Sequence, residues 1–193
     1  VELFADEEEL DTWLESARAL VRRYFDLENP TTLEPRDREM RLQVSLPTGL
    51  RLRGYVDRLD VSPSGQIRIV DYKTGKSPLP RFEDRDRLQI FFYAVMIWRD
   101  LGVVPTRLQL VYLGGDGAVR WYDPTEDELR AAGAEVSDIW AQIEAAGRTG
   151  VWQPRKSRLC DWCEHQALCP EFGGTPPPLP VPKVGSSRPS TTD

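Results

Sequence analysis

Two aspartates and a lysine stand close together on a predicted β-hairpin, residues 50–76. Asp57 falls in the first strand, and Asp71 and Lys73 fall in the second. Two facing carboxylates repel each other unless a cation lies between them, and Mg²⁺ or Mn²⁺ would serve. Lys73 would then stabilise charge that develops on a phosphate. The trio predicts metal-assisted attack of water on a phosphodiester. The alternative interpretation is a surface hairpin whose polar side is merely solvated.

The turn of this hairpin predicts its register. Ser62-Pro63-Ser64-Gly65 is typical of a three-residue loop with a bulge at the glycine. Pairing of Ser62 with Gln66 would set Asp60 opposite Arg68, and further along it would set Asp57 opposite Asp71. Strict alternation then places the following residues on one face: Leu59, Val61, Ile67, Ile69, Asp57, Asp71, Lys73 and Tyr55.

The remaining pattern predicts a mixed sheet with helices packed on it, of the α/β class. Helices are expected over about 6–25, 83–101 and 125–146, and further strands over 38–46, 106–113 and 118–122. The apolar stripe of the first helix is expected to join the core. In the second helix, Gln89 and Tyr93 are four residues apart, so they share a face that can look toward the acidic end of the hairpin.

Several of these motifs together resemble the RecB-like branch of the PD-(D/E)XK nucleases. The resemblance covers roughly residues 39–170, and rests on the motifs 54–60 and 71–75 and on the pair Gln89 and Tyr93. It implies a restriction-endonuclease-like fold, with DNA as the substrate.

The same resemblance assigns roles to individual residues. It implies that Asp57 and Asp71 bind the metal, that Lys73 is catalytic, and that Gln89 and Tyr93 lie beside the site. Many relatives carry a glutamate on the strand before the hairpin, and Glu39 occupies that position here.

The distribution of charge favours a nucleic-acid partner despite a net charge of −6. Residues 34–87 hold twelve basic and nine acidic side chains, so the basic excess coincides with the hairpin. The candidates for DNA contact are Arg53, Arg58, Lys76 and Arg85.

All three cysteines fall within ten residues, at Cys160, Cys163 and Cys169. In a cytosolic protein such clustering indicates a metal. A Zn²⁺ site could add His165, the single histidine, as a fourth ligand. A 4Fe-4S cluster ordinarily takes four thiolates. Resemblance to nucleases of the AddB type and to CRISPR-associated nucleases favours the iron–sulfur cluster, although the upstream cysteine and an early histidine of those relatives are absent. We expect that the natural chain begins before Val1 and supplies them.

The expected organisation is a nuclease core over 1–150, a cysteine-cluster segment over 151–172 and a Pro/Ser/Thr-rich disordered tail over 173–193. No apolar run approaches the length of a membrane-spanning helix, and a cytoplasmic location is expected.

Together these observations predict a metal-dependent deoxyribonuclease, an exonuclease of DNA repair or recombination that acts on ends or single strands. A helicase or another repair protein would be its partner. Two alternatives stay open: a domain of the same fold that binds DNA ends without cutting, and a CRISPR-adaptation nuclease.

Overall fold

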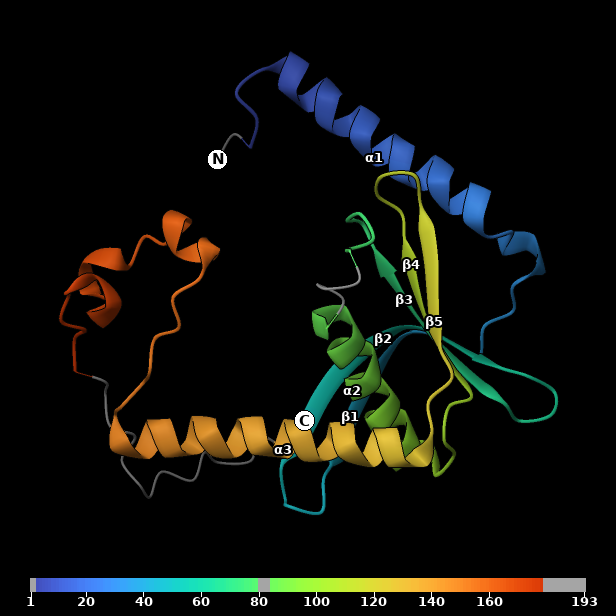
Figure 1. Cartoon of the computed structure of the whole chain (residues 1–193). Coiled ribbons are helices and arrows are strands. Elements are labelled where there is room, and N and C mark those ends of the chain that lie inside the picture. The colour runs from blue at the N-terminus through green and yellow to red at the C-terminus, as the bar shows by residue number, and fades with distance from the viewer. Residues whose placement is uncertain (1–2, 80–83, 179–193) are drawn as a thin grey trace, which may run out of the picture. The chain divides into compact units, whose positions relative to one another are not determined.

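The computed structural model describes residues 3–79 and 84–178. The chain forms two compact units, 1–137 and 138–193. The first unit holds a five-stranded sheet and the helices that pack on it (Figure 1). The helix α3 (Glu126–Thr149) begins in the first unit and continues into the second.

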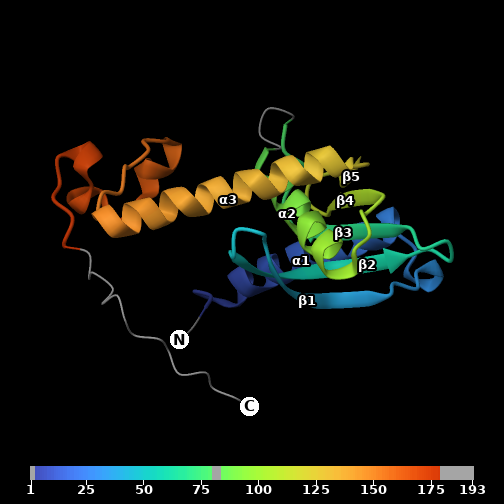
Figure 2. The ribbon, with the colours of Figure 1, turned by 90° about the horizontal axis from the view of Figure 1, so that it is seen from below.

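The sheet has the strand order β1-β2-β3-β4-β5, which Figure 2 shows from below. Its strands are β1 (Asp37–Ser45), β2 (Arg51–Val61), β3 (Ile67–Lys73), β4 (Arg107–Tyr112) and β5 (Ala118–Tyr122). The β3 and β4 strands are parallel, and helix α2 (Asp84–Leu101) connects them, whereas every other neighbouring pair is antiparallel. The expected mixed α/β architecture is therefore confirmed.

From its turn to the pair of Arg58 and Val70, the β2–β3 hairpin has the predicted register, but the ladder does not include the predicted pair of Asp57 and Asp71. Asp60 pairs with Arg68, and the two side chains form an ion pair with 2.7 Å between Nη2 and Oδ2. In the turn, the Gly65 amide donates to the Ser62 carbonyl at 2.9 Å, and Gly65 has a φ of 83°. That φ explains why glycine stands there, because other residues rarely adopt it.

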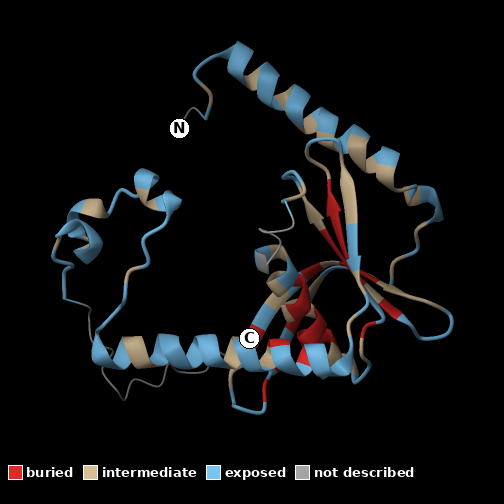
Figure 3. Cartoon of the chain, in the orientation of Figure 1, coloured by how far each residue is buried: buried red, intermediate tan, exposed pale blue. Residues whose placement is uncertain are grey.

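The core lies between the sheet and α2. Residues at the middle of α2 are fully buried, as the red segment in Figure 3 shows, and they pack on the central strands. The first turns of α3 add Leu129 and Ala132 to this core. Thr125 and Glu128 form a capping box, in which the Glu128 amide donates to Thr125 Oγ1 at 3.2 Å and the Thr125 amide donates to Glu128 Oε2 at 2.9 Å.

Helix α1 (Glu7–Leu27) is capped by Asp6, whose side chain accepts a hydrogen bond from the Glu9 amide at 2.8 Å. The expectation that its apolar stripe joins the core was wrong, since none of its residues, all of them described, is buried. Trp13 and Val21 are 54% and 57% exposed. Only the C-terminal end is tied to the sheet, where Arg23 Nη2 donates to the Gly115 carbonyl at 3.1 Å. An amphipathic pattern predicts a helix but not which surface covers its apolar side.

Up to residue 178, the second unit contains three short turns of 3-10 helix, Arg158–Trp162, Gln166–Leu168 and Pro170–Phe172. The predicted tail lies outside the described residues beyond position 178. Among the helices of the described residues, none combines the length and apolar character needed to cross a membrane.

Candidate active site

The predicted catalytic residues of β3 and α2 form one chain of polar contacts. Lys73 Nζ lies 2.8 Å from Asp71 Oδ2 and donates to Gln89 Oε1 at 2.6 Å. Gln89 Nε2 in turn donates to the hydroxyl of Tyr93 at 3.1 Å. Each side chain therefore restricts the next, and the ammonium of Lys73 is held between a carboxylate and an amide.

Asp57 of β2 lies next to Asp71 and Lys73. Its Oδ2 accepts a hydrogen bond of 2.8 Å from the backbone amide of Tyr72, the residue between Asp71 and Lys73. The ladder between β2 and β3 ends at the pair Arg58 and Val70, one position earlier. The Asp57 carboxylate thus binds a β3 amide beyond the end of the regular ladder.

The alternation of side chains changes at this point in β2, which corrects the expected face of Tyr55. A Cβ added to Gly54 would lie 3.0 Å from Tyr93 Cε1, so residues 54 and 56 face α2. Leu59 also belongs to the α2 core, although it is three residues after Val56 and strict alternation would put it on the other face. Tyr55 consequently points away from α2 and is 50% exposed.

An irregular backbone accompanies this change of face. Glu39 of β1 stands opposite Asp57 in the register, between the pairs formed by residues 38 and 40, and it has a φ of 49°. A positive φ is strained for a residue other than glycine, and such strain often occurs at functional sites. The side chain of Glu39 is exposed, and none of the contacts in the described part of the chain joins it to the aspartates.

The electrostatics of Asp71 suit a cation. Burial raises the pKa of Asp71 above its ordinary value; the ammonium of Lys73 opposes this rise, and the negative charges of Asp57 and Asp86 add to it. The Oδ2 atom of Asp71 is buried and has no hydrogen bond of normal geometry, although Lys73 lies close. A divalent cation would satisfy this oxygen, so the residues fit a Mg²⁺ or Mn²⁺ ion bound by Asp57 and Asp71.

Asp86 is a third acid near this site that the sequence interpretation missed. It lies on α2, and its Oδ2 accepts a hydrogen bond of 2.7 Å from the Tyr112 hydroxyl of β4. The spacing in the sequence indicates this position, because Asp86 precedes Gln89 by three residues and so shares its helix face.

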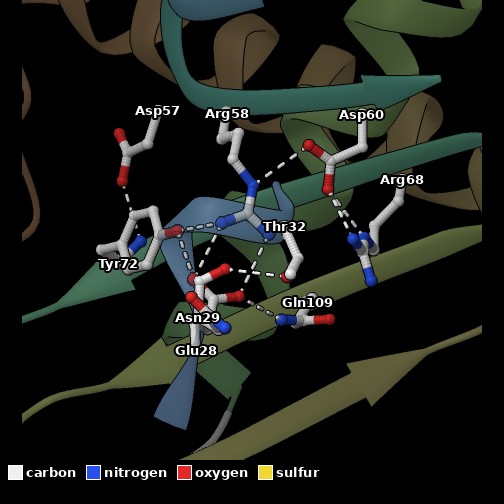
Figure 4. Close-up of polar contacts among 9 residues, drawn as sticks. All are labelled: Glu28, Asn29, Thr32, Asp57, Arg58, Asp60, Arg68, Tyr72 and Gln109. Atoms are coloured by element: carbon white, nitrogen blue, oxygen red, sulfur yellow. Dashed lines mark hydrogen bonds and ion pairs between the residues drawn. The ribbon is translucent and has the colours of Figure 1, made fainter. Parts of the chain in front are cut away.

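A buried ion-pair network joins the end of α1 to the sheet, next to Asp57 (Figure 4). Arg58 Nη1 donates to Glu28 Oε2 at 2.8 Å, and Arg58 Nε lies 3.1 Å from Asp60 Oδ1. The hydroxyl of Tyr72 accepts a hydrogen bond from Arg58 and donates to Glu28 Oε2 at 2.6 Å. Gln109 of β4 donates to Glu28 Oε1 at 3.3 Å. One carboxylate at the end of α1 thus connects three strands.

The network also sets the ionisation of its members. Burial opposes the charge of Glu28, but hydrogen bonds from Arg58 and Tyr72 outweigh it and hold the pKa of Glu28 below its ordinary value. Burial and the bond to Glu28 raise the pKa of the Tyr72 hydroxyl well above its usual value. Tyr72 therefore stays a neutral donor, fixed between the two residues that flank it in the site.

The predicted DNA-contact residues divide into two groups. Arg53, Lys76 and Arg85 are exposed, whereas Arg58 is 4% exposed and its guanidinium is held in the network.

The three cysteines form no disulfide, and their side chains are not grouped as metal ligands would be. Within the described residues, no group of three or more His, Cys, Asp or Glu side chains is arranged to hold a metal ion. The Sγ of Cys160 accepts a hydrogen bond from the Ser157 amide at 3.4 Å. Three thiols do not complete a four-thiolate cluster, so the iron–sulfur and zinc assignments both stay predictions.

Two phage proteins and one solved bacterial structure are similar to this chain. Gene 69 proteins of Mycobacterium phages L5 and D29 are 26% and 29% identical to this chain over 129 residues, 64% of its length. The matched region spans 41% and 44% of those proteins, less than half of each. A crystal structure named "putative exonuclease" from Eubacterium rectale has a TM-score of 0.52 and 16% identity, over 78% of this chain and 59% of that one. This likeness shows a shared fold.

Residues 2–170 match the PD-(D/E)XK nuclease superfamily, a range that contains the sheet, the acidic pair and Lys73. Because the match covers most of the sequence and the fold agrees with it, the chain belongs to the PD-(D/E)XK nuclease superfamily.

Proposed function

We propose that this chain is a metal-dependent nuclease that hydrolyses phosphodiester bonds of DNA. The observation that carries the proposal is the arrangement around Asp71: a buried carboxylate oxygen without a normal hydrogen bond, 2.8 Å from the Lys73 ammonium and coupled electrostatically to Asp57. Lys73 offsets part of the cost of burying this carboxylate, and a divalent cation beside it would offset more.

In this proposal Asp57 and Asp71 hold one Mg²⁺ or Mn²⁺ ion. The bound metal would supply a Lewis acid that activates water and withdraws charge from the phosphate. The protein positions the two acids: the Tyr72 amide fixes Asp57, and Lys73 fixes Asp71.

Lys73 has the second role, because its ammonium can stabilise negative charge as the phosphodiester is attacked. Gln89 orients Lys73 through Oε1 and is itself oriented by Tyr93. We therefore assign Gln89 and Tyr93 as positioning residues on the face of α2 that borders the site.

We extend the proposal to exonuclease action on ends or single strands of DNA, in repair or recombination, with a helicase or another repair protein as partner. The RecB-like motifs support this extension, and the name of the Eubacterium rectale protein supports only its exonuclease part.

The test incubates the chain with labelled single-stranded and duplex DNA in Mn²⁺ or Mg²⁺. Lys73→Ala and Asp71→Asn should each lower the rate constant by roughly 100-fold or more, the usual effect of removing one electrostatic contact to the transition state. The matched control is Asp116→Asn, an exposed acid in the β4–β5 turn, which should cleave like the unaltered chain.

Circular single-stranded DNA separates the two modes of cleavage, because an exonuclease needs an end. Digestion of linear strands alone supports the exonuclease assignment, whereas digestion of circles contradicts it. If the unaltered chain cleaves no DNA with either metal, the hydrolytic proposal is wrong and a non-cleaving DNA-binding domain takes its place.

A further inference from the structure

One face of the β1–β2 pair is basic and exposed. Its residues, here called the arginine ribbon, are Arg41, Gln43, Arg51, Arg53 and Tyr55. Cross-strand pairing joins Arg41 with Tyr55, Gln43 with Arg53, and Ser45 with Arg51, so these side chains project together from the sheet.

The stretch of sequence that contains the ribbon is basic. From Met40 to Val56 it includes the three arginines of the ribbon and no acidic residue. The three arginines of the ribbon make no ion pair with any described residue, unlike Arg58 of β2 and Arg68 of β3. These exposed guanidinium groups are therefore available to bind an anion such as a phosphate.

The opposite face of the same two strands explains why the ribbon cannot turn inward. Leu42, Val44 and Leu52 are buried in the α2 core, and Gly54 packs against Tyr93. The change of alternation between Val56 and Leu59 keeps Tyr55 on the outer face although the active site is two residues away.

The ribbon leads to the candidate active site. Two residues of extended strand, about 7 Å, separate Tyr55 from Asp57. On this face of the sheet, Asp57 and the exposed Arg38 line a cavity of 540 Å³ together with Tyr24, Leu33 and Tyr72. A chain of phosphates that follows the arginines would thus reach one of the two metal-binding carboxylates.

We propose that the arginine ribbon binds single-stranded DNA and guides it to Asp57. The arginines would contact consecutive phosphates, and the half-exposed ring of Tyr55 would stack on an unpaired base. Stacking of this kind requires an accessible base face, which a duplex does not offer along its length. The inference rests on the proposed nuclease function and adds the surface that binds the single strand.

The test measures binding without cleavage. Fluorescence anisotropy of a labelled oligothymidylate, with the full chain in a chelator, gives the dissociation constant at several salt concentrations. Arg41→Gln and Arg53→Gln should each weaken binding and lower the slope of log affinity against log salt by about 0.7 for each lost phosphate contact. The matched control is Arg99→Gln, an exposed arginine at the end of α2, which should leave the slope unchanged.

The tyrosine is tested by a pair of variants. Tyr55→Ser should weaken binding by roughly 5- to 150-fold, the range for loss of one stacked base, whereas Tyr55→Phe should bind like the unaltered chain. Circular dichroism checks that each variant is folded; because all these side chains are exposed, we expect no change.

Three results overturn the inference: no binding of the single strand at low salt, equal affinity for a duplex of the same length, or ribbon variants that behave like Arg99→Gln. Failure of the nuclease proposal gives a different result. The chain would then cleave no DNA in Mn²⁺, while DNA binding and its dependence on the ribbon would persist.

Discussion

The ion pair between Glu28 and Arg58 offers a quantitative test of the structure. The two side chains are 9% and 5% exposed, so neither can exchange its partner for water. Removing one partner from a buried pair costs about 3–5 kcal/mol, because the other charge stays buried. Arg58 keeps Asp60 at 3.1 Å, and a glutamine retains one acceptor oxygen. We therefore expect Glu28→Gln to lower the free energy of unfolding by about 3 kcal/mol, near the lower limit of that range.

The dependence of this loss on pH follows from the ionisation of Glu28. Its pKa in the folded chain lies below the ordinary value of 4.5, so its charged form is favoured by folding. The stabilisation is fully present above the unfolded-state pKa and is lost as the pH falls through the folded-state pKa. The difference between the unaltered chain and Glu28→Gln should therefore be constant near neutral pH and shrink as the solution becomes acidic.

Urea unfolding followed by circular dichroism, repeated over a range of pH, measures this difference. Glu15→Gln is the matched control, because Glu15 pairs with Arg22 at 2.7 Å but both side chains are more than half exposed. An exposed pair contributes little, so the control should unfold like the unaltered chain. Equal effects of the two substitutions, or a loss at Glu28 that is independent of pH, would refute the argument.

Three further results are expected. Asp86→Asn should lower the pKa of Asp71, since the charge of Asp86 helps to raise it, and carbon-13 NMR titration of the metal-free chain measures the shift. Gly114→Ala should reduce stability by about 1–3 kcal/mol in urea unfolding, because the new Cβ would lie 2.6 Å from the Thr74 carbonyl oxygen. Metal analysis of anaerobically purified protein should find bound iron that is lost when any one of the three cysteines is replaced; loss of bound zinc in His165→Gln would instead favour the zinc site.

Local chemistry explains why much of the fold could be predicted. The bulged turn at Gly65 set the hairpin register, and the spacing of Gln89 and Tyr93 set their common face on α2. Both signals depend on residues within a few positions of each other, so tertiary contacts did not alter them.

The errors arose where distant segments meet. Strict alternation predicted Tyr55 on the active-site face, but the irregularity opposite Glu39 has no signature in the strand sequence. The partner of Arg58 is Glu28, thirty residues earlier and just beyond the end of a helix, and no periodicity links them. Because Glu28 and Arg58 are distant in the sequence, Arg58 was predicted to contact DNA, whereas it is buried in the ion-pair network.

The position of Glu28 has a practical consequence for anyone who shortens this polypeptide. A version that starts after Glu28 would keep all five strands and every residue assigned to catalysis. It would nevertheless leave the guanidinium of Arg58 with Asp60 alone and Tyr72 without its acceptor. Expression boundaries should therefore include the first helix and Glu28, the residue that follows it, even though that helix contributes no fully buried side chain.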